Sequence, residues 1–149
     1  MKIALPPVVA LITLVIMFGV NRLLPNMTYT FLGQGIAYYI FIGTGMIFLV
    51  AASLKFGELK TTTNPIDPSA ASTLAVSGVY KISRNPIYLA FVLILTGWAI
   101  NFGNPVNIVP LAGFAWFITE FQIKREESAL REKFGVEYDD YCKRTRRWL

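Results

Sequence analysis

The sequence contains no histidine and only one cysteine, Cys142, among its 149 residues. A single cysteine excludes a disulfide within the chain. Without histidine, the common zinc sites and the Ser/His or Cys/His nucleophile pairs lose their usual ligand or base. The sequence also lacks a Walker loop and a CxxC pair. We therefore expect no metal site and no histidine-based catalysis, and we regard Cys142, which lies in a charged segment, as incidental.

Charged residues are scarce, whereas apolar residues are abundant. Charged residues make up 15% of the chain and hydrophobic residues 54%, and the mean hydropathy is +0.51. These values are high for a soluble domain of this size. Four apolar runs, 4–20, 34–54, 86–100 and 105–121, carry the excess, and about 20 helical residues cross a bilayer. We predict a single all-α domain, residues 1–149, that is an integral membrane protein with about four transmembrane helices.

The last two apolar runs are shorter and are separated by the turn sequence NFGNP. They are expected to form a helical hairpin, with a re-entrant pair as the alternative. The first run follows Lys2, as in a signal peptide, but no small-residue cleavage site follows it, so we expect it to remain as a span. In the second run, GTGMIF lacks the third glycine and the preceding strand of a dinucleotide loop. We expect Gly35, Gly43 and Gly45 to serve close helix packing instead.

The distribution of positive charge predicts the orientation of the chain. Of the fourteen Lys and Arg residues, only Arg22 falls on the side of the first and third connections. Because cytoplasmic loops are enriched in Lys and Arg, both termini, the loop 55–85 and the tail 122–149 are predicted to be cytoplasmic. A multi-pass protein of the cell (inner) membrane follows, with its polar groups concentrated at the cytoplasmic face.

The basic end of the chain has a simple electrostatic interpretation. Lys143, Arg144, Arg146 and Arg147 lie beyond the last span, where basic side chains are attracted to anionic lipids. Nucleic acid is a poor alternative, because most aromatic residues belong to the predicted spans and no basic reading helix stands apart from the bilayer. We therefore expect the membrane, and no nucleic acid, as a partner.

One short motif places a cation at the start of a predicted helix. Pro86 suits the first turn of a helix, and Asn85 precedes it as a candidate cap. Arg84 therefore stands beside a helix N-terminus, which favours a carboxylate or a phosphate. Binding of an anionic ligand and anchoring to a lipid headgroup are both open at this point.

After the fourth run, Ile123, Leu130 and Phe134 form one helical stripe, and Gly135 is a natural stop before a second helix near Val136. This amphipathic cytoplasmic helix carries Glu126 and Glu127, close to the membrane. The predicted hairpin brings this carboxylate pair to Arg84 and Asn85. Together the groups could hold a zwitterion, and the alternative is an ordinary Arg–Glu ion pair.

Two stretches, GVYKISRNPIY and EESALREKFGVEYDDYCKRTRRW, resemble the signature motifs of the isoprenylcysteine carboxyl methyltransferase and phospholipid methyltransferase superfamily. The first motif of that superfamily reads Gly-x-Tyr and then Arg-His/Asn-Pro-x-Tyr. The second reads Glu-Glu-x-x-Leu and then Phe-Gly-x-x-Tyr-x-x-Tyr. The resemblance covers roughly residues 61–149, and it implies methyl transfer from S-adenosylmethionine bound without a Rossmann domain.

Site residues follow from the resemblance position by position. The cofactor-contacting positions fall on Ser72, Thr73, Leu74, Ala75, Tyr80, Arg84, Asn85, Pro86, Ile87, Tyr88 and Glu126. The histidines of the eukaryotic isoprenylcysteine enzymes are replaced by Ser72 and Asn85. Their substrate-contacting arginine is replaced by Gln122, with Arg125 as a neighbouring substitute. A prenylcysteine substrate is therefore put in doubt.

Methyl transfer needs few catalytic side chains, because the sulfonium of S-adenosylmethionine is already activated. The enzyme must chiefly align the methyl donor with its acceptor. An amine acceptor must lose a proton, for which Glu127 is the candidate acceptor, and Arg84 is its candidate catalytic partner. A lipophilic carboxylate, amine or thiol is expected to reach the site laterally from the membrane. The alternatives are an NADPH-dependent membrane reductase of the sterol-reductase type and a non-catalytic membrane protein.

Overall fold

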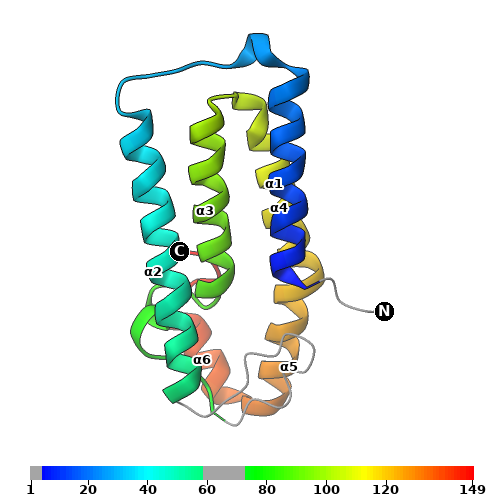
Figure 1. Cartoon of the computed structure of the whole chain (residues 1–149). Helices are drawn as coiled ribbons and strands as arrows, with labels where there is room; N and C mark the ends of the chain where they lie inside the picture. The colour runs from blue at the N-terminus through cyan, green and yellow to red at the C-terminus, as the bar shows by residue number, and fades with distance from the viewer. Residues whose placement is uncertain (1–4, 59–72) are drawn as a thin grey trace.

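The computed structural model describes residues 5–58 and 73–149, and the part of the chain that it describes contains helices and turns but no strand. The helices are α1 (Pro6–Leu23), α2 (Gln34–Glu58), α3 (Pro86–Phe102), α4 (Ile108–Ile118), α5 (Lys124–Phe134) and α6 (Val136–Arg144). Helices α1 to α4 run side by side, and α5 and α6 lie at the end opposite the α1–α2 connection (Figure 1). The all-helical prediction is thus confirmed.

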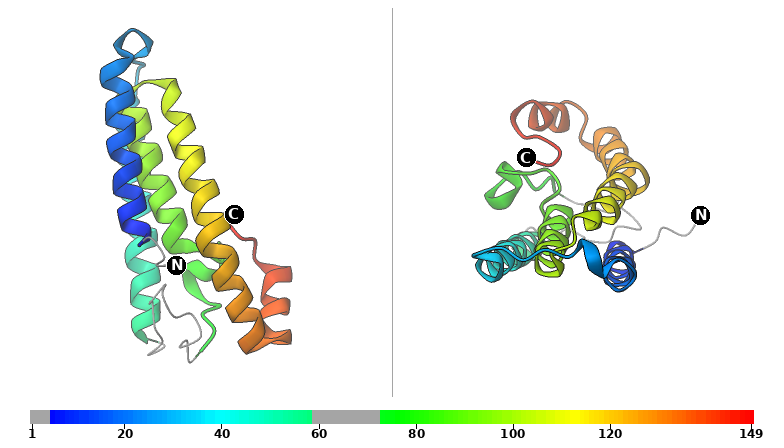
Figure 2. Two further views of the ribbon diagram at one scale, coloured as in Figure 1. Left: turned by 90° about the vertical axis from the view of Figure 1, so that its right-hand side faces the viewer. Right: turned by 90° about the horizontal axis from the view of Figure 1, so that it is seen from above.

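Helix α3 is the central element of the helical layer. It packs against α1, α2 and α4, and the view from above places it between α2 on one side and α1 and α4 on the other (Figure 2). Its buried residues include Leu89, Ala90 and Leu95. Helix α3 therefore has neighbours on three sides. This packing fixes the position of its first residue, Pro86.

Close contact between α2 and α3 depends on two glycines. A Cβ atom on Gly45 would lie 2.7 Å from Ile94 Cγ1 and 3.0 Å from the Ala90 carbonyl oxygen, and one on Gly97 would lie 3.1 Å from Ile42. No heavy atom lies within 4 Å of a Cβ built on Gly35 or Gly43. The predicted packing role is therefore confirmed for Gly45 and is wrong for Gly35 and Gly43.

The turn between α3 and α4 requires a glycine. Gly103 ends α3 with φ 66°, and a Cβ atom there would lie 2.2 Å from the Tyr29 carbonyl oxygen. The Tyr29 N–H donates to the Gly103 carbonyl at 2.9 Å, and Asn104 Nδ2 donates to the Leu24 carbonyl at 3.0 Å. These bonds tie the α3–α4 turn to the α1–α2 connection.

The helix of the predicted fourth span does not end at residue 121. Helix α4 continues through a π-helical turn, Thr119–Ile123, directly into α5. No residue breaks the helix at the predicted boundary between span and tail, 121/122, so that boundary stays a prediction. The loop predicted from residue 55 begins later, because α2 continues to Glu58. π-Helical turns often occur at functional sites, and here Gln122 and Ile123 are both buried.

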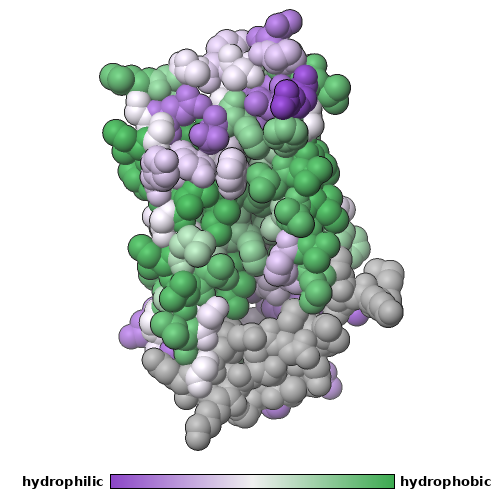
Figure 3. Space-filling model, in the orientation of Figure 1, coloured by the Kyte–Doolittle hydropathy of each residue, from purple (hydrophilic) through white to green (hydrophobic). Residues whose placement is uncertain are grey.

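Three helical stretches are long and apolar enough to cross a membrane: α1, residues Gln34–Lys55 of α2, and Pro105–Phe134. Helix α3 is apolar but has 17 residues, about 26 Å at 1.5 Å per residue. Apolar side chains cover the middle of the face shown in Figure 3, and polar ones gather at the end that carries the α1–α2 and α3–α4 connections. A membrane protein is thus supported, and the four-span count remains a prediction.

Two apolar clusters hold the described elements together. One lies between α1, α3 and α4 and includes Met17, Leu95 and Phe114. The other lies at the α5–α6 end and contains Ala52, Leu74, Ala75, Tyr80, Tyr138 and Tyr141. The Tyr141 hydroxyl donates to the Tyr80 carbonyl at 2.6 Å. This second cluster fixes the segment before α3 against α2 and α6, so it positions the residues of both signature motifs.

Candidate functional site

The segment before α3 is held by the residues that follow α6. The Arg84 N–H donates to the Arg146 carbonyl at 3.0 Å. Ser83 Oγ and Asn85 Nδ2 both donate to the Arg147 carbonyl, at 3.2 and 3.0 Å. Asn85 is the N-cap residue of α3, as predicted, but its side chain makes no cap bond to α3. The side-chain amide instead bonds the segment after α6.

An ion-pair network lies beside this junction. Glu127 accepts from Arg84 Nη2 at 3.0 Å, and from Arg147 Nε and Nη2 at 2.9 and 2.7 Å. The Arg84 and Glu127 side chains are only 13% and 11% exposed. The hydrogen bond to Glu127 raises the pKa of Arg147 above its usual value. Two guanidinium groups therefore share one largely buried side-chain carboxyl group, which fixes both of them in place.

Glu126 belongs to a different cluster from its neighbour Glu127. Its Oε1 accepts from the Tyr88 hydroxyl at 2.5 Å and from Gln122 Nε2 at 2.6 Å. Adjacent helical residues project about 100° apart, so the two carboxylates point to separate partners. Both of these bonds end on Oε1 of Glu126.

The structure brings most of the predicted cofactor-binding residues to one end of the bundle. Leu74, Ala75 and Tyr80 are buried in the second apolar cluster, and Ile87 packs against it. Pro86 and Tyr88 are buried in the first turn of α3. Thr73 is exposed, and Ser72 lies outside the described residues.

The two predicted substrate positions separate. Gln122 is buried, with 3% of its surface exposed, whereas Arg125 is exposed. A regular α-helix places residues three apart on one face, but the π-helical turn ends just after Gln122. Gln122 and Arg125 thus differ in exposure, and the role of Arg125 as a substitute stays a prediction.

Sequence reasoning missed Arg147 and Ser83 as members of this site. Arg147 was expected to anchor the chain to anionic lipids, but its guanidinium contacts Glu127. Arg147 does lie within the second signature stretch, which ends in RTRRW. Net charge alone, however, does not distinguish it from the other three basic residues near the end of the chain. Among residues 5–58 and 73–149, no group of three or more His, Cys, Asp or Glu residues comes together as in a metal site.

Burial also sets the protonation of the tyrosines that surround the site. Burial raises the pKa of Tyr141 and of Tyr80 above the usual value of a phenol. Both hydroxyls therefore remain protonated at neutral pH, and Tyr141 is a donor toward Tyr80. The site thus contains neutral tyrosines, two carboxylates and two guanidinium groups, with apolar helices on one side.

Comparisons with known proteins identify the family of the chain. The sequence model of a family described as phospholipid methyltransferase matches residues 33–137. Protein-S-isoprenylcysteine O-methyltransferase A of Arabidopsis thaliana is 32% identical over 103 residues, which cover 69% of this chain and 52% of that protein. Protein-S-isoprenylcysteine O-methyltransferase of Mus musculus is 35% identical over 78 residues, 52% of this chain and 28% of the mouse protein.

A shorter relative matches along its whole length. An uncharacterized protein of Haemophilus influenzae is 43% identical over 63 residues, 42% of this chain and all of that protein. The chain spans about half the length of the plant relative and less of the mouse one. No solved structure matches the chain.

Proposed function

The chain belongs to the phospholipid methyltransferase family, and from this premise we propose that it transfers a methyl group from S-adenosylmethionine to a lipophilic acceptor at the cytoplasmic face of the membrane. The observation that carries the proposal is the separation of Arg84 and Glu126, which have different partners at the start of α3. A guanidinium and a carboxylate held apart in this way suit the carboxylate and the ammonium of an amino acid.

The residues present fit such a cofactor. Arg84 Nε is buried and has no hydrogen-bond partner among the described residues, so an unsatisfied donor stands where an anionic group would be bound. Glu126 Oε2 is the matching acceptor for an ammonium group. Leu74, Ala75 and Tyr80 supply the apolar and aromatic surroundings that small-molecule sites usually have.

The chain's own residues would bind and orient the cofactor and exclude water from it. S-adenosylmethionine supplies the methyl group on an activated sulfonium, so the protein needs chiefly to align donor and acceptor. Tyr88 and Gln122 hold Glu126, and Glu127 holds Arg84. The apolar sides of α3 and α4 keep this end of the bundle poor in water, which strengthens each charged contact.

Glu127 takes a different role from the one that the sequence suggested. Both of its oxygens accept from guanidinium groups, so they are engaged with Arg84 and Arg147. We assign it the positioning of Arg84. A carboxylate acceptor, already ionised at pH 7, or a thiolate would need no base from the protein.

The acceptor is proposed to be lipophilic but not a prenylated protein C-terminus. Gln122 stands where the isoprenylcysteine enzymes have an arginine, and an amide does not neutralise a carboxylate. The difference in exposure between Arg125, which is exposed, and Gln122, which is buried, argues against Arg125 as a replacement. Comparing methyl transfer to a farnesylcysteine analogue and to a panel of membrane lipids tests this point. Robust transfer to the analogue alone, lost in Arg125→Ala, would contradict it.

Methyl-labelled S-adenosylmethionine provides the test of the function as a whole. Membranes containing the protein should accumulate label in the lipid extract, and membranes containing Glu126→Gln should not. Unlabelled extracts from membranes with folded parent protein would contradict the proposal. No observation favours the NADPH-dependent reductase or the non-catalytic protein.

A further inference from the structure

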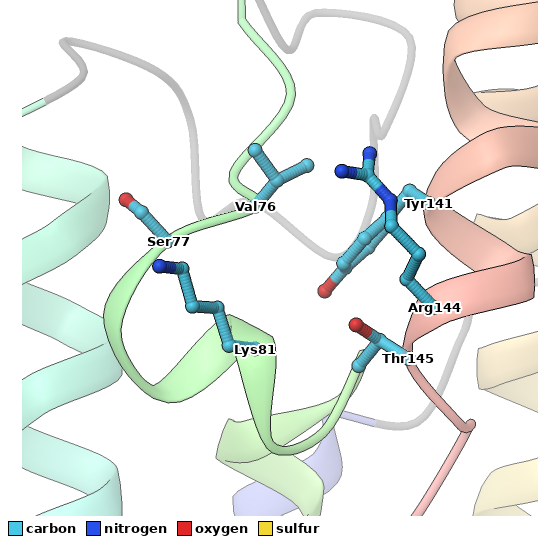
Figure 4. A pocket seen from close by; sticks show the side chains of 6 residues that line it. All are labelled: Val76, Ser77, Lys81, Tyr141, Arg144 and Thr145. Atoms are coloured by element: carbon cyan, nitrogen blue, oxygen red, sulfur yellow. The ribbon is translucent and has the colours of Figure 1, made fainter.

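A hollow of about 420 Å³ lies between the turn before α3 and the C-terminal end of α6, outside the ion-pair network of Glu127. It is lined by Val76, Ser77, Lys81, Tyr141, Arg144 and Thr145. Lys81 and Ser77 project from one side of it, and Arg144, Tyr141 and Thr145 from the other (Figure 4). Its volume falls within the range of small-molecule sites, about 300–1,000 Å³.

The charges of the hollow are all positive. Lys81 and Arg144 line it and no carboxylate does. Neither of these two side chains forms an ion pair with a carboxylate in the part of the chain that the structure describes. On α6, the Asp140 side chain accepts from Lys143 at 2.8 Å, and the Asp140 main-chain carbonyl accepts from Arg144 Nε at 3.3 Å. Two cations that face one hollow with no carboxylate in its lining favour an anion between them.

The neutral lining adds hydrogen-bonding hydroxyls. Ser77 and Thr145 line the hollow together with the two cations, and Thr145 is buried at 6% exposure. Tyr141 also lines it, but its hydroxyl donates to the Tyr80 carbonyl. Hydroxyls and cations together are the usual partners of a phosphate group, which offers several acceptor oxygens.

The surroundings of the hollow are apolar and exposed. Val76, in the lining, is 36% exposed, and Ile82, next to Lys81 in the chain, is 51% exposed. The hollow also lies at the end of the bundle that carries nearly all of the basic residues, which is the end expected at the cytoplasmic headgroups. Apolar side chains beside a cationic hollow suit a molecule with a phosphate head and a hydrocarbon tail.

We propose that this hollow is a phosphate-binding site that takes the headgroup of an anionic phospholipid, separate from the site of the methyl donor and acceptor. The site needs no covalent step. Lys81 and Arg144 would contact the phosphate, and Ser77 and Thr145 would donate to its oxygens. Binding there would hold the segment before α3 against α6, because the hollow is formed between these two elements.

The test uses the purified full-length protein in a nonionic detergent, titrated with dihexanoylphosphatidylglycerol below its micellar concentration. Saturable binding is expected, at least tenfold weaker in Lys81→Gln/Arg144→Gln. The control is Lys124→Gln/Lys133→Gln, which removes the same charge from α5 and should stay within about twofold of the parent. Equal losses in both double variants, or no saturable binding to the parent, would overturn the proposal.

Further titrations identify the source of the phosphate and separate this site from the proposed cofactor site. Inorganic phosphate that competes with the lipid would support the site, and inorganic phosphate that binds when the lipid does not would overturn the assignment to a lipid headgroup. Arg84→Ala should retain lipid binding, and Lys81→Gln/Arg144→Gln should retain S-adenosylmethionine binding. Loss of cofactor binding in that double variant would show that the hollow belongs to the cofactor site and would overturn the proposal.

Discussion

The guanidinium of Arg147 meets both carboxylate oxygens of Glu127, with Nε–Oε1 at 2.9 Å and Nη2–Oε2 at 2.7 Å. Twenty residues separate the two in the chain, and α6 with its preceding turn lies between them. Because Glu127 also accepts from Arg84, the segment after α6 is coupled to the start of α3 through one carboxylate.

Arg147→Ala is therefore expected to weaken S-adenosylmethionine binding although Arg147 has no assigned contact with the cofactor. Truncating one partner of a charged network leaves the other charges less well held, at a cost of about 1.5–3 kcal/mol for a hydrogen bond to a charged group. That cost converts to a loss of roughly tenfold or more. Arg146→Ala is the matched control, because its side chain has no part in the network and only its main-chain carbonyl accepts from Arg84.

A double-mutant cycle separates positioning from general destabilisation. If Arg147 acts through Glu127 on Arg84, the losses in Arg84→Ala and Arg147→Ala should not add, with a coupling of about 0.5–3 kcal/mol in the binding free energy. Thermal unfolding of each variant is recorded alongside. Strict additivity of the two binding losses would show that Arg147 serves stability alone.

Tyr88→Phe tests the second carboxylate. This change removes the 2.5 Å hydrogen bond to Glu126 and leaves the aromatic ring in the α3 core, so the fold should persist. Cofactor affinity should fall by about tenfold, in line with 1.5 kcal/mol or more for a charged hydrogen bond. Tyr39→Phe, at a tyrosine that is 72% exposed on α2, should bind like the parent. Unchanged affinity in Tyr88→Phe would contradict the role given to Glu126.

Gly103→Ala should destabilise the fold without involving the site. An alanine there needs an unfavourable positive φ and places its Cβ 2.2 Å from the Tyr29 carbonyl oxygen, which costs on the order of 1–3 kcal/mol. The melting temperature in detergent should fall by several degrees. Gly113→Ala, where no heavy atom lies within 4 Å of the new Cβ, should melt close to the parent. Equal melting of the two variants would show that the turn can rearrange.

The membrane orientation has its own test. With Cys142→Ser as background, cysteines at Asn26 and Glu137, both exposed, should be labelled from opposite sides of the membrane, Glu137 from the cytoplasm. This result is expected because nearly all Lys and Arg residues are predicted to lie on the same side of the membrane as Glu137. Labelling of both positions from the same side would contradict the orientation.

Much of the fold was predictable, because the length of an apolar run and the residues that start or end a helix are local signals in the sequence. Pro86 marked the start of α3, and Gly135 marked the break between α5 and α6. The continuation of α4 into α5 was not predictable, because a π-helical turn carries no breaking residue and the change from apolar to charged sequence suggested a boundary. The packing glycines were misjudged for a related reason: spacing alone does not show which face of α2 meets α3.

The sequence brought together several residues of the candidate site, but it did not predict which side chains pair with each other. The resemblance selected Arg84 and Glu126, and hairpin topology brought their elements together. Pairing depends on side-chain direction: Glu127, not Glu126, reaches Arg84, while Glu126 turns to Tyr88 and Gln122. The role of Arg147 was not predicted, because a turn and a helix separate it from Glu127 in the chain. Its positive charge alone suggested a contact with the membrane surface.

Titration of purified, detergent-solubilised protein with S-adenosylmethionine tests the central claim most directly. The account predicts saturable binding to the parent, at least tenfold weaker binding to Arg84→Ala and to Glu126→Gln, and parental binding to Lys124→Gln. NADPH should not compete. Absence of binding to the folded parent, or parental affinity in both Arg84→Ala and Glu126→Gln, would contradict the account.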